Sequence, residues 1–188
     1  MKKEIFQEIC SQVFSTLEIK EQLTIYLEGE SSQYFRFNDS KLRQSGIIED
    51  YAVTISLFSG KKSLQAATTV SSDIESSVNN LINEIHALRD PLSLIPENEF
   101  TSFPGSFESV EMIKSGQLPE RNEILEALMN VITKDYLTGV WTSGKIFRAC
   151  STSEGTNHWF EKDSFIFDFS LIDEKENMVK VLFPGSSW

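Results

Sequence analysis

The sequence predicts an α+β fold, in which antiparallel meander sheets are accompanied by three amphipathic helices. Apolar residues recur three and four positions apart in three segments, which is the spacing of a helix that buries one face. In several other segments they alternate with polar residues, as in strands with one buried face. The chain has 188 residues, of which 40% are hydrophobic, so it can fill a substantial core.

The first helix is expected at residues 3–17. Cys10 lies within its apolar stripe, so we expect a packed core thiol rather than a reactive one. The stripe consists of Ile5, Phe6, Ile9, Cys10, Val13, Phe14 and Leu17.

A run of strands is expected next, beginning with residues 22–28 and 33–37. Asn38-Asp39-Ser40 has the composition of a turn. Residues 51–70 predict a hairpin that turns at Ser59-Gly60-Lys61. Because short strands follow one another through tight turns, this part predicts an antiparallel meander.

A second amphipathic helix is expected at residues 72–89. Ser72-Asp73 forms a good N-cap at its start, and Pro91 and Pro96 are expected to end it. Residues 91–117 contain several Pro and Gly residues and show no clear period, which predicts a long loop.

The third helix is expected at about residues 119–135, with Pro119 at an early helical position. Strands are expected after it at residues 136–142, 145–151, 157–162, 163–171 and 178–183. In the segment 163–171, a row of apolar side chains shares one face, so Asp168 should face solvent or a basic neighbour on another strand. That row is Phe165, Phe167, Phe169 and Leu171.

The whole chain, 1–188, is expected to form a single domain with a possible internal repeat. Residues 1–90 and 118–188 both consist of a helix followed by strands, and the loop 91–117 joins them. Alignment of Phe35 with Phe147 also brings similar turn and strand sequences together. Two duplicated helix-plus-meander units are one interpretation. Two copies of a short pattern also arise by chance, so both interpretations stay open.

Composition excludes several functional classes. The formal net charge is −11, which disfavours binding to nucleic acid and to anionic lipid. No apolar run approaches the roughly 20 residues that span a bilayer, and the N-terminus lacks the apolar core of a signal peptide. A cytoplasmic protein is therefore expected.

Two groups of residues are candidates for a catalytic or a metal site. Cys150 and His158 flank a predicted hairpin turn and could meet as a nucleophile and its base, although strand pairing alone would bring them together equally well. His86 and Asp90 lie four residues apart on the second helix, but no third ligand has a suitable spacing. Neither HExxH nor a phosphate-binding glycine motif occurs. Local motifs alone therefore identify no enzyme.

Two longer stretches resemble the N-terminal half of the TldD/PmbA family, whose members are described as modulators of DNA gyrase and as metallopeptidases. They are "SGKIFRACSTSEGTNHWFE" with the following "DSFIFDFSL", and "YFRFNDSKLRQSGIIEDYAVTISLFSGKKSLQAATT". The resemblance covers about residues 20–188. One departure is that Gly60–Ala66 lacks the second glycine of the family's hairpin.

The resemblance implies a domain without catalysis of its own. In peptidase members, the HExxxH zinc helix and a further cysteine ligand lie in a C-terminal domain, and this sequence contains no HExxxH. We therefore expect no catalytic or metal-binding residue and no cofactor in this chain, with zinc only in the C-terminal domain of peptidase-type homologues. The chain is expected to be an N-terminal α/β domain of such a peptidase or of its partner subunit.

The resemblance also implies partners: a second copy or a TldD/PmbA-type heterodimer partner, and an extended peptide or unfolded segment enclosed by the domain. Nucleic acid and membrane are not expected. The residues expected to contact peptide or partner are Arg36, Arg43, Arg148, Ser153 and His158. For Arg36 and Arg148 the alternative is an ordinary cross-strand ion pair. The alternative function is a free-standing peptide- or protein-binding regulatory module.

Overall fold

The computed structural model describes residues 1–131 and 136–187, and it confirms the predicted α+β class. A seven-stranded sheet has the order β3-β2-β1-β5-β6-β4, and β7 also pairs with β6. Two meanders, β1–β2–β3 and β5–β6–β7, therefore meet where β1 lies beside β5. The helices and strands are α1 (Lys3–Phe14), β1 (Glu21–Asn38), β2 (Lys41–Ser59), β3 (Lys62–Thr69), α2 (Ile74–Leu94), β4 (Glu111–Lys114), α3 (Arg121–Val131), β5 (Tyr136–Thr152), β6 (Asn157–Ile172) and β7 (Met178–Gly185).

The chain forms two compact units. Unit 1 comprises Met1–Gly29, Asp50–Ile113 and Phe147–Phe160, and unit 2 comprises Glu30–Glu49, Lys114–Ile146 and Glu161–Trp188. The strands β1, β2, β5 and β6 each contribute to both. These units do not coincide with the sequence halves 1–90 and 118–188, and the duplication stays a prediction.

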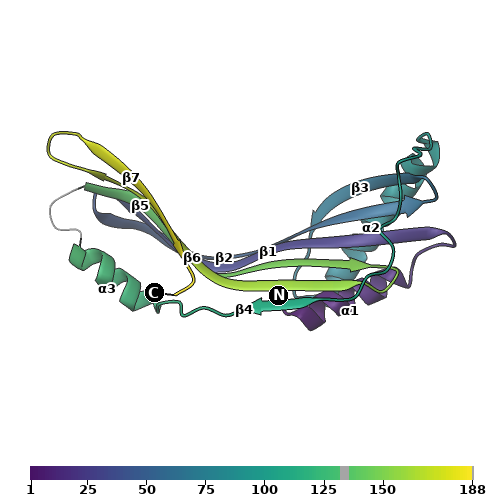
Figure 1. Ribbon diagram of the computed structural model, residues 1–188, viewed down its shortest axis with the longest axis horizontal. Helices are drawn as coiled ribbons and strands as arrows, with labels where there is room; N and C mark the ends of the chain where they lie inside the picture. Colours follow the sequence, from purple (N-terminus) through teal and green to yellow (C-terminus); the bar gives the residue numbers. More distant parts are fainter. Residues whose placement is uncertain (132–135, 188) are drawn as a thin grey trace. The chain divides into compact units, whose positions relative to one another are not determined.

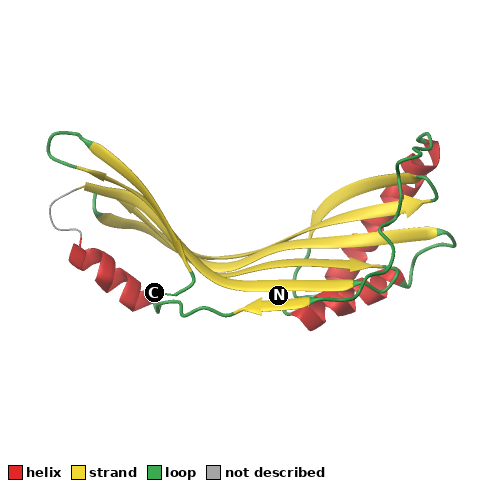
Figure 2. Ribbon diagram, viewed as in Figure 1, coloured by secondary structure: helices red, strands yellow, loops and turns green. Residues whose placement is uncertain are grey.

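Unit 1 buries the apolar faces of α1 and α2 against its strands (Figure 2). The predicted stripe of α1 provides Phe6, Ile9, Cys10 and Val13 to this core, and α2 provides Leu81 and Ile85. Alternate residues of β1 complete the layer: Leu23, Ile25 and Leu27 are fully buried. The alternation that predicted a strand here therefore also identified its buried face.

The sequence-based prediction is right about the start of α2 and wrong about its end. Asp73 is the N-cap, as expected, and its carboxylate accepts a hydrogen bond from the Ser76 N–H at 3.2 Å. Pro91, however, does not end the helix, which continues to Leu94. A proline removes a single backbone donor, and burial of Leu92 in the core holds the extra turn in place. The predicted loop 91–117 thus contains the last turn of α2 and the strand β4.

Unit 2 has its own core beneath α3. Trp141 stacks on Phe165 with ring centroids 4.7 Å apart, and α3 contributes Ile124 and Leu128. The predicted row on β6 is confirmed, since Phe165 and Phe167 are buried and Phe169 and Leu171 pack beside them. Asp168, on the other face, pairs with Lys180 at 3.4 Å. The described part of α3 ends at Val131, and the predicted continuation over 132–135 lies outside the described residues.

The long strands differ from the short ones that were predicted. Segments 22–28 and 33–37 form one strand, β1, and the four segments between 136 and 171 form the two strands β5 and β6. Polar stretches such as Glu30–Gln33 interrupt the apolar alternation, which is why the sequence suggested separate strands. In the structure they stay in the sheet; for example, Gln33 donates a side-chain hydrogen bond to Ser143 on β5.

Candidate functional site

The edge of unit 2 that is formed by β7 is the candidate binding surface. Antiparallel pairing joins β7 to β6 from Phe165↔Gly185 to Ile172↔Met178. Among the described residues, β7 pairs with no other strand. The backbone N–H and C=O groups along its other edge are therefore open to pairing with a further strand.

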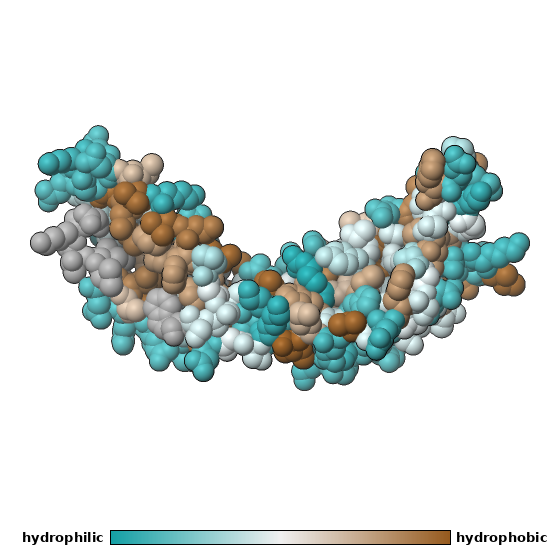
Figure 3. All heavy atoms as spheres, viewed as in Figure 1, coloured by the Kyte–Doolittle hydropathy of each residue, from teal (hydrophilic) through white to brown (hydrophobic). Residues whose placement is uncertain are grey.

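Side chains on β7 are apolar on both faces of the sheet. Val179 and Phe183 share the face of the aromatic row of β6, and they are 61% and 54% exposed. Leu182 on the opposite face is 61% exposed. Apolar side chains are gathered over this part of the sheet in Figure 3. Large exposed apolar residues grouped in this way are typical of a surface that another polypeptide covers.

The core of unit 2 continues into this surface without a break. Phe183 lies beside Phe165, with ring centroids 5.8 Å apart, whereas the buried residues of α3 lie over Trp141, Phe165 and Phe167. The described residues thus bury Phe165 and Phe167 and leave Val179 and Phe183 exposed on the same face. The charged pair Lys180–Asp168 belongs to the opposite face, so the face of the aromatic row stays uncharged at β7.

Arg36 and Arg43, two of the residues predicted to bind, belong to unit 2 but not to β7. Arg36 is exposed on β1 and makes no ion pair within the described residues. Arg43 is held at the β1–β2 turn: its Nε donates to the Asn38 carbonyl at 3.2 Å, and its Nη2 lies 3.9 Å from the Asp39 carboxylate. Arg36 is therefore free to reach a partner, whereas Arg43 is engaged at its own turn.

Arg148 and Ser153 belong to unit 1 and make local contacts. Arg148 on β5 forms the cross-strand ion pair that was the alternative expectation, with its Nε 3.3 Å from Glu28 on β1. Ser153 exchanges hydrogen bonds with Leu23, accepting through its Oγ at 3.0 Å and donating through its backbone N–H at 2.9 Å. Both contacts join β1 to the β5–β6 hairpin, and a role in binding stays a prediction for each residue.

No hydrogen bond within the described residues joins the side chains of His158 and Cys150. The Thr152 N–H bonds the Thr156 carbonyl at 2.9 Å, a register that places position 150 opposite position 158. His158 nevertheless uses Nδ1 to accept the Val110 N–H at 3.2 Å, which attaches the chain before β4 to β6. Burial raises the pKa of the Cys150 thiol, whereas a catalytic thiol needs a lowered pKa.

A metal site on α2 has no support either. The Nδ1 atom of His86 lies 3.2 Å from the Arg89 guanidinium, a cationic neighbour that opposes a metal ion. Within the described residues, no group of three or more His, Cys, Asp or Glu side chains is arranged to hold a metal ion. No described helix is long and apolar enough to cross a membrane.

Three solved structures are similar to this chain over nearly its full length. A protein from Thermotoga maritima, described as a candidate modulator of a DNA gyrase, aligns with a TM-score of 0.67 and 13% identity over 97% of this chain and 44% of its own. TldE from Thermococcus kodakarensis aligns with a TM-score of 0.63 and 9% identity, over 96% and 42%. A candidate gyrase modulator from Bacteroides thetaiotaomicron gives 0.55 and 12%, over 98% and 45%. The chain has the TldE fold.

This likeness confirms the resemblance to the TldD/PmbA family at the level of the fold. This chain spans less than half the length of each of the three proteins. No protein-family model matches the sequence, and no curated protein matches it either.

Sequence reasoning did not identify β7 as part of a site. The segment 178–183 was expected to be a strand, which β7 confirms, but its pattern contained no sign of an unpaired edge. The available signal was composition: of the eight residues in MVKVLFPG, only Lys180 is charged. A strand with apolar residues at both alternating sets of positions is buried on both faces or covered by a partner.

Proposed function

We propose that this chain is a non-catalytic N-terminal domain of a TldD/PmbA-type metallopeptidase or of its partner subunit, which contributes to dimerisation and to the enclosure of an extended peptide. The observation that carries the proposal is the unpaired, apolar strand β7. The TldE fold supports it, because the proteins that share this fold are more than twice as long as the chain.

Strand addition is the physical mode that fits β7. An extended segment placed along its open edge gains backbone hydrogen bonds, and its alternate side chains lie on the two apolar faces of the sheet. Val179, Val181 and Phe183 would then be covered on one face, and Met178 and Leu182 on the other. Backbone pairing needs no particular side chains, so a domain that binds in this way accepts many sequences.

The same edge serves dimerisation. In an antiparallel pair of two β7 strands centred on Val181, Val179 of one copy faces Phe183 of the other, and Lys180 faces Leu182. Neither face then places like charges directly opposite one another, which would disfavour pairing. Because each copy carries a formal charge of −11, their association should strengthen as salt screens the repulsion between them.

Hydrogen–deuterium exchange tests this proposal. We expect the amides of β7 to gain protection as the chain concentration rises, or when a capped octapeptide of alternating valine and lysine is added. The peptide is chosen because its charge complements that of the chain. Leu182→Lys should abolish this gain, since it places a positive charge opposite Lys180 of a second copy or beside the lysines of the peptide. Ile47→Lys is the matched control, because Ile47 is 77% exposed on β2 and lies outside β7.

Light scattering on the same samples measures association directly. A mass above that of one chain, reduced by Leu182→Lys but not by Ile47→Lys, supports dimerisation through β7. If β7 exchanges at the same rate with and without peptide and at every concentration, the proposal is wrong.

A further inference from the structure

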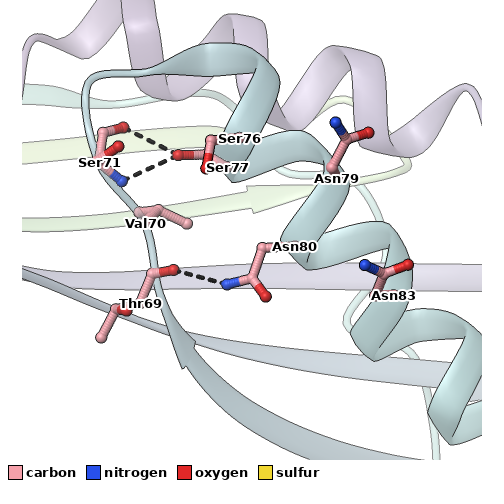
Figure 4. A pocket seen from close by; sticks show the side chains of 8 residues that line it. All are labelled: Thr69, Val70, Ser71, Ser76, Ser77, Asn79, Asn80 and Asn83. Atoms are coloured by element: carbon pink, nitrogen blue, oxygen red, sulfur yellow. Dashed lines mark hydrogen bonds between the residues drawn. The ribbon is translucent and has the colours of Figure 1, made fainter.

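A pocket of about 530 Å³ lies in unit 1 between the end of β3 and α2 (Figure 4). Its lining is unusual for so acidic a chain, because it contains no charged and no aromatic side chain. Seven of its eight residues carry an uncharged hydroxyl or amide, and the eighth is Val70. The lining residues are Thr69, Val70, Ser71, Ser76, Ser77, Asn79, Asn80 and Asn83.

Part of this polar set holds the pocket together. Asn80 donates through Nδ2 to Thr68 Oγ1 at 2.8 Å and to the Thr69 carbonyl at 3.0 Å. Ser77 Oγ accepts the Ser71 N–H at 3.0 Å and donates to the Ser71 carbonyl at 3.1 Å. These contacts fix the chain that leaves β3 against α2, so the wall of the pocket is preformed.

Asn79 and Asn83 do not contribute to these hydrogen bonds. Both are exposed, and neither side chain has a hydrogen-bond partner within the described residues. In Figure 4 the Asn80 amide points to Thr69, whereas no hydrogen bond is drawn to the amides of Asn79 and Asn83. Asparagine is a poor helix former. Two adjacent turns of α2 therefore carry an unfavourable residue without any internal contact that compensates for it.

The chemistry of the lining selects the class of ligand. The absence of a basic side chain disfavours a phosphate, and the absence of a carboxylate disfavours a cation. The pocket has no aromatic platform on which a sugar ring could stack. A primary amide presents a donor and an acceptor side by side, which matches the N–H and C=O groups of a peptide backbone.

The spacing of the two amides also fits a peptide. Positions four residues apart on one helix face are separated by about 6 Å along the axis. Equivalent backbone groups of an extended chain repeat every second residue, at about 6.7 Å. We propose that Asn79 and Asn83 bind the backbone of an extended peptide in this pocket, independently of its side chains. The class of ligand follows from the proposed function, but the site is separate from β7.

The test uses the full chain and two-dimensional NMR of its asparagine side-chain amides. The probes are two capped hexapeptides, one of alternating alanine and threonine and one of alternating alanine and glutamine. We expect both to shift the Asn79 and Asn83 side-chain resonances with similar affinity, because only the backbone is bound. N-methylation of alternate residues removes backbone donors, and it can be done at either of the two alternating sets of positions. The version that removes the donors facing the asparagines should bind about tenfold more weakly.

Variants locate the site. Asn79→Ala combined with Asn83→Ala should weaken binding about tenfold or more, without loss of folded structure by circular dichroism. Asn122→Ala is the matched control, because Asn122 is an exposed asparagine near the start of α3 in unit 2. It should leave binding unchanged.

Three results would overturn the inference: unchanged binding in the double variant, equal binding of the N-methylated peptides, or shifts caused by glucose but not by either hexapeptide. If the peptides shift β7 amides and leave Asn79 and Asn83 unaffected, this inference fails while the proposed function stands. If the peptides shift the resonances of the two asparagines, while the β7 amides show no shift here and no added protection in the exchange experiment, the proposed role of β7 fails and this site stands.

Discussion

Replacement of Arg89 by methionine should destabilise unit 1 more than the removal of a charge from an exposed ion pair does. The Arg89 guanidinium forms a two-pronged pair with Glu21: Nε lies 2.9 Å from Oε1, and Nη2 lies 2.9 Å from Oε2. It also donates to the Thr16 carbonyl at 3.2 Å, beyond the end of α1. The Glu21 and Arg89 side chains are only 9% and 17% exposed. One side chain of α2 thus ties together α2, the start of β1 and the segment that follows α1.

The size of the effect follows from this geometry. A hydrogen bond to a charged group contributes about 1.5–3 kcal/mol, and removing one partner of a buried pair leaves the other charge unpaired. Because the pair is only partly shielded from solvent, we expect Arg89→Met to lower the free energy of unfolding by about 2–3 kcal/mol. For a chain of this length, that corresponds to a fall in Tm of about 4–12 °C. Thermal and urea unfolding followed by circular dichroism measure both quantities.

Arg148→Met is the matched control for this substitution. Arg148 also bridges two elements through a carboxylate, but its side chain and that of Glu28 are 43% and 53% exposed. Exposed pairs contribute about 1 kcal/mol or less, so this variant should unfold almost like the parent. If both arginine variants lose the same stability, or if Arg89→Met loses less than about 0.5 kcal/mol, burial does not set the strength of the pair and the reasoning is refuted.

Four further predictions follow from local geometry. The hydrogen bonds from Arg89 lower the pKa of Glu21. The Glu21 carboxylate therefore contributes its full stabilisation above about pH 4.3, and this stabilisation is lost as the pH falls through the lowered folded-state pKa. The difference in stability between the parent and Glu21→Gln, measured by urea unfolding, should shrink in acid, and a larger difference in acid would contradict this prediction. Gly139→Ala should cost about 1–3 kcal/mol, because the added Cβ would lie 2.5 Å from the Asp168 carbonyl oxygen; an unchanged Tm would show that β5 and β6 separate easily here. Burial raises the pKa of Cys10 to about 12, so a thiol reagent at neutral pH should label Cys10 only after unfolding, as mass spectrometry of labelled peptides can verify. Elemental analysis of the purified chain should find no stoichiometric zinc. One zinc per chain would contradict this prediction and would make His86, His158 and Cys150 the candidate ligands.

Periodicity was a good guide wherever one face of an element is buried. The stripe of α1 and the alternation of Leu23, Ile25 and Leu27 predicted both the element and its inward face, because burial imposes the pattern directly. The hairpin turn at Ser59-Gly60-Lys61 was also found, since Ser59 pairs with Lys62 and Gly60 has the positive φ of 59° that favours glycine.

The errors have a common physical cause, because they concern positions that tertiary contacts decide. The polar segment Glu30–Gln33 stays within β1 through cross-strand contacts that no local pattern encodes. Pro91 stays helical because Leu92 is buried. The candidate sites depend on neighbours in the same way: Asn79 and Asn80 have the same side chain and adjacent numbers, yet one meets β3 and the other meets solvent.

The two units differ in how their helices cover the sheet. In unit 1, two helices cover the strands, and Arg89 joins α2 to the start of β1 and to the segment after α1. In unit 2, the described part of α3 covers Phe165 and Phe167 but leaves Val179 and Phe183 exposed on the same face. An apolar strand with an open edge is an aggregation hazard when the molecule folds slowly around it. Lys180 and Pro184 limit that hazard, since a charge and a missing N–H both hinder indiscriminate pairing. An edge that is protected in this way and still apolar at most of its positions is compatible with the proposed pairing along β7.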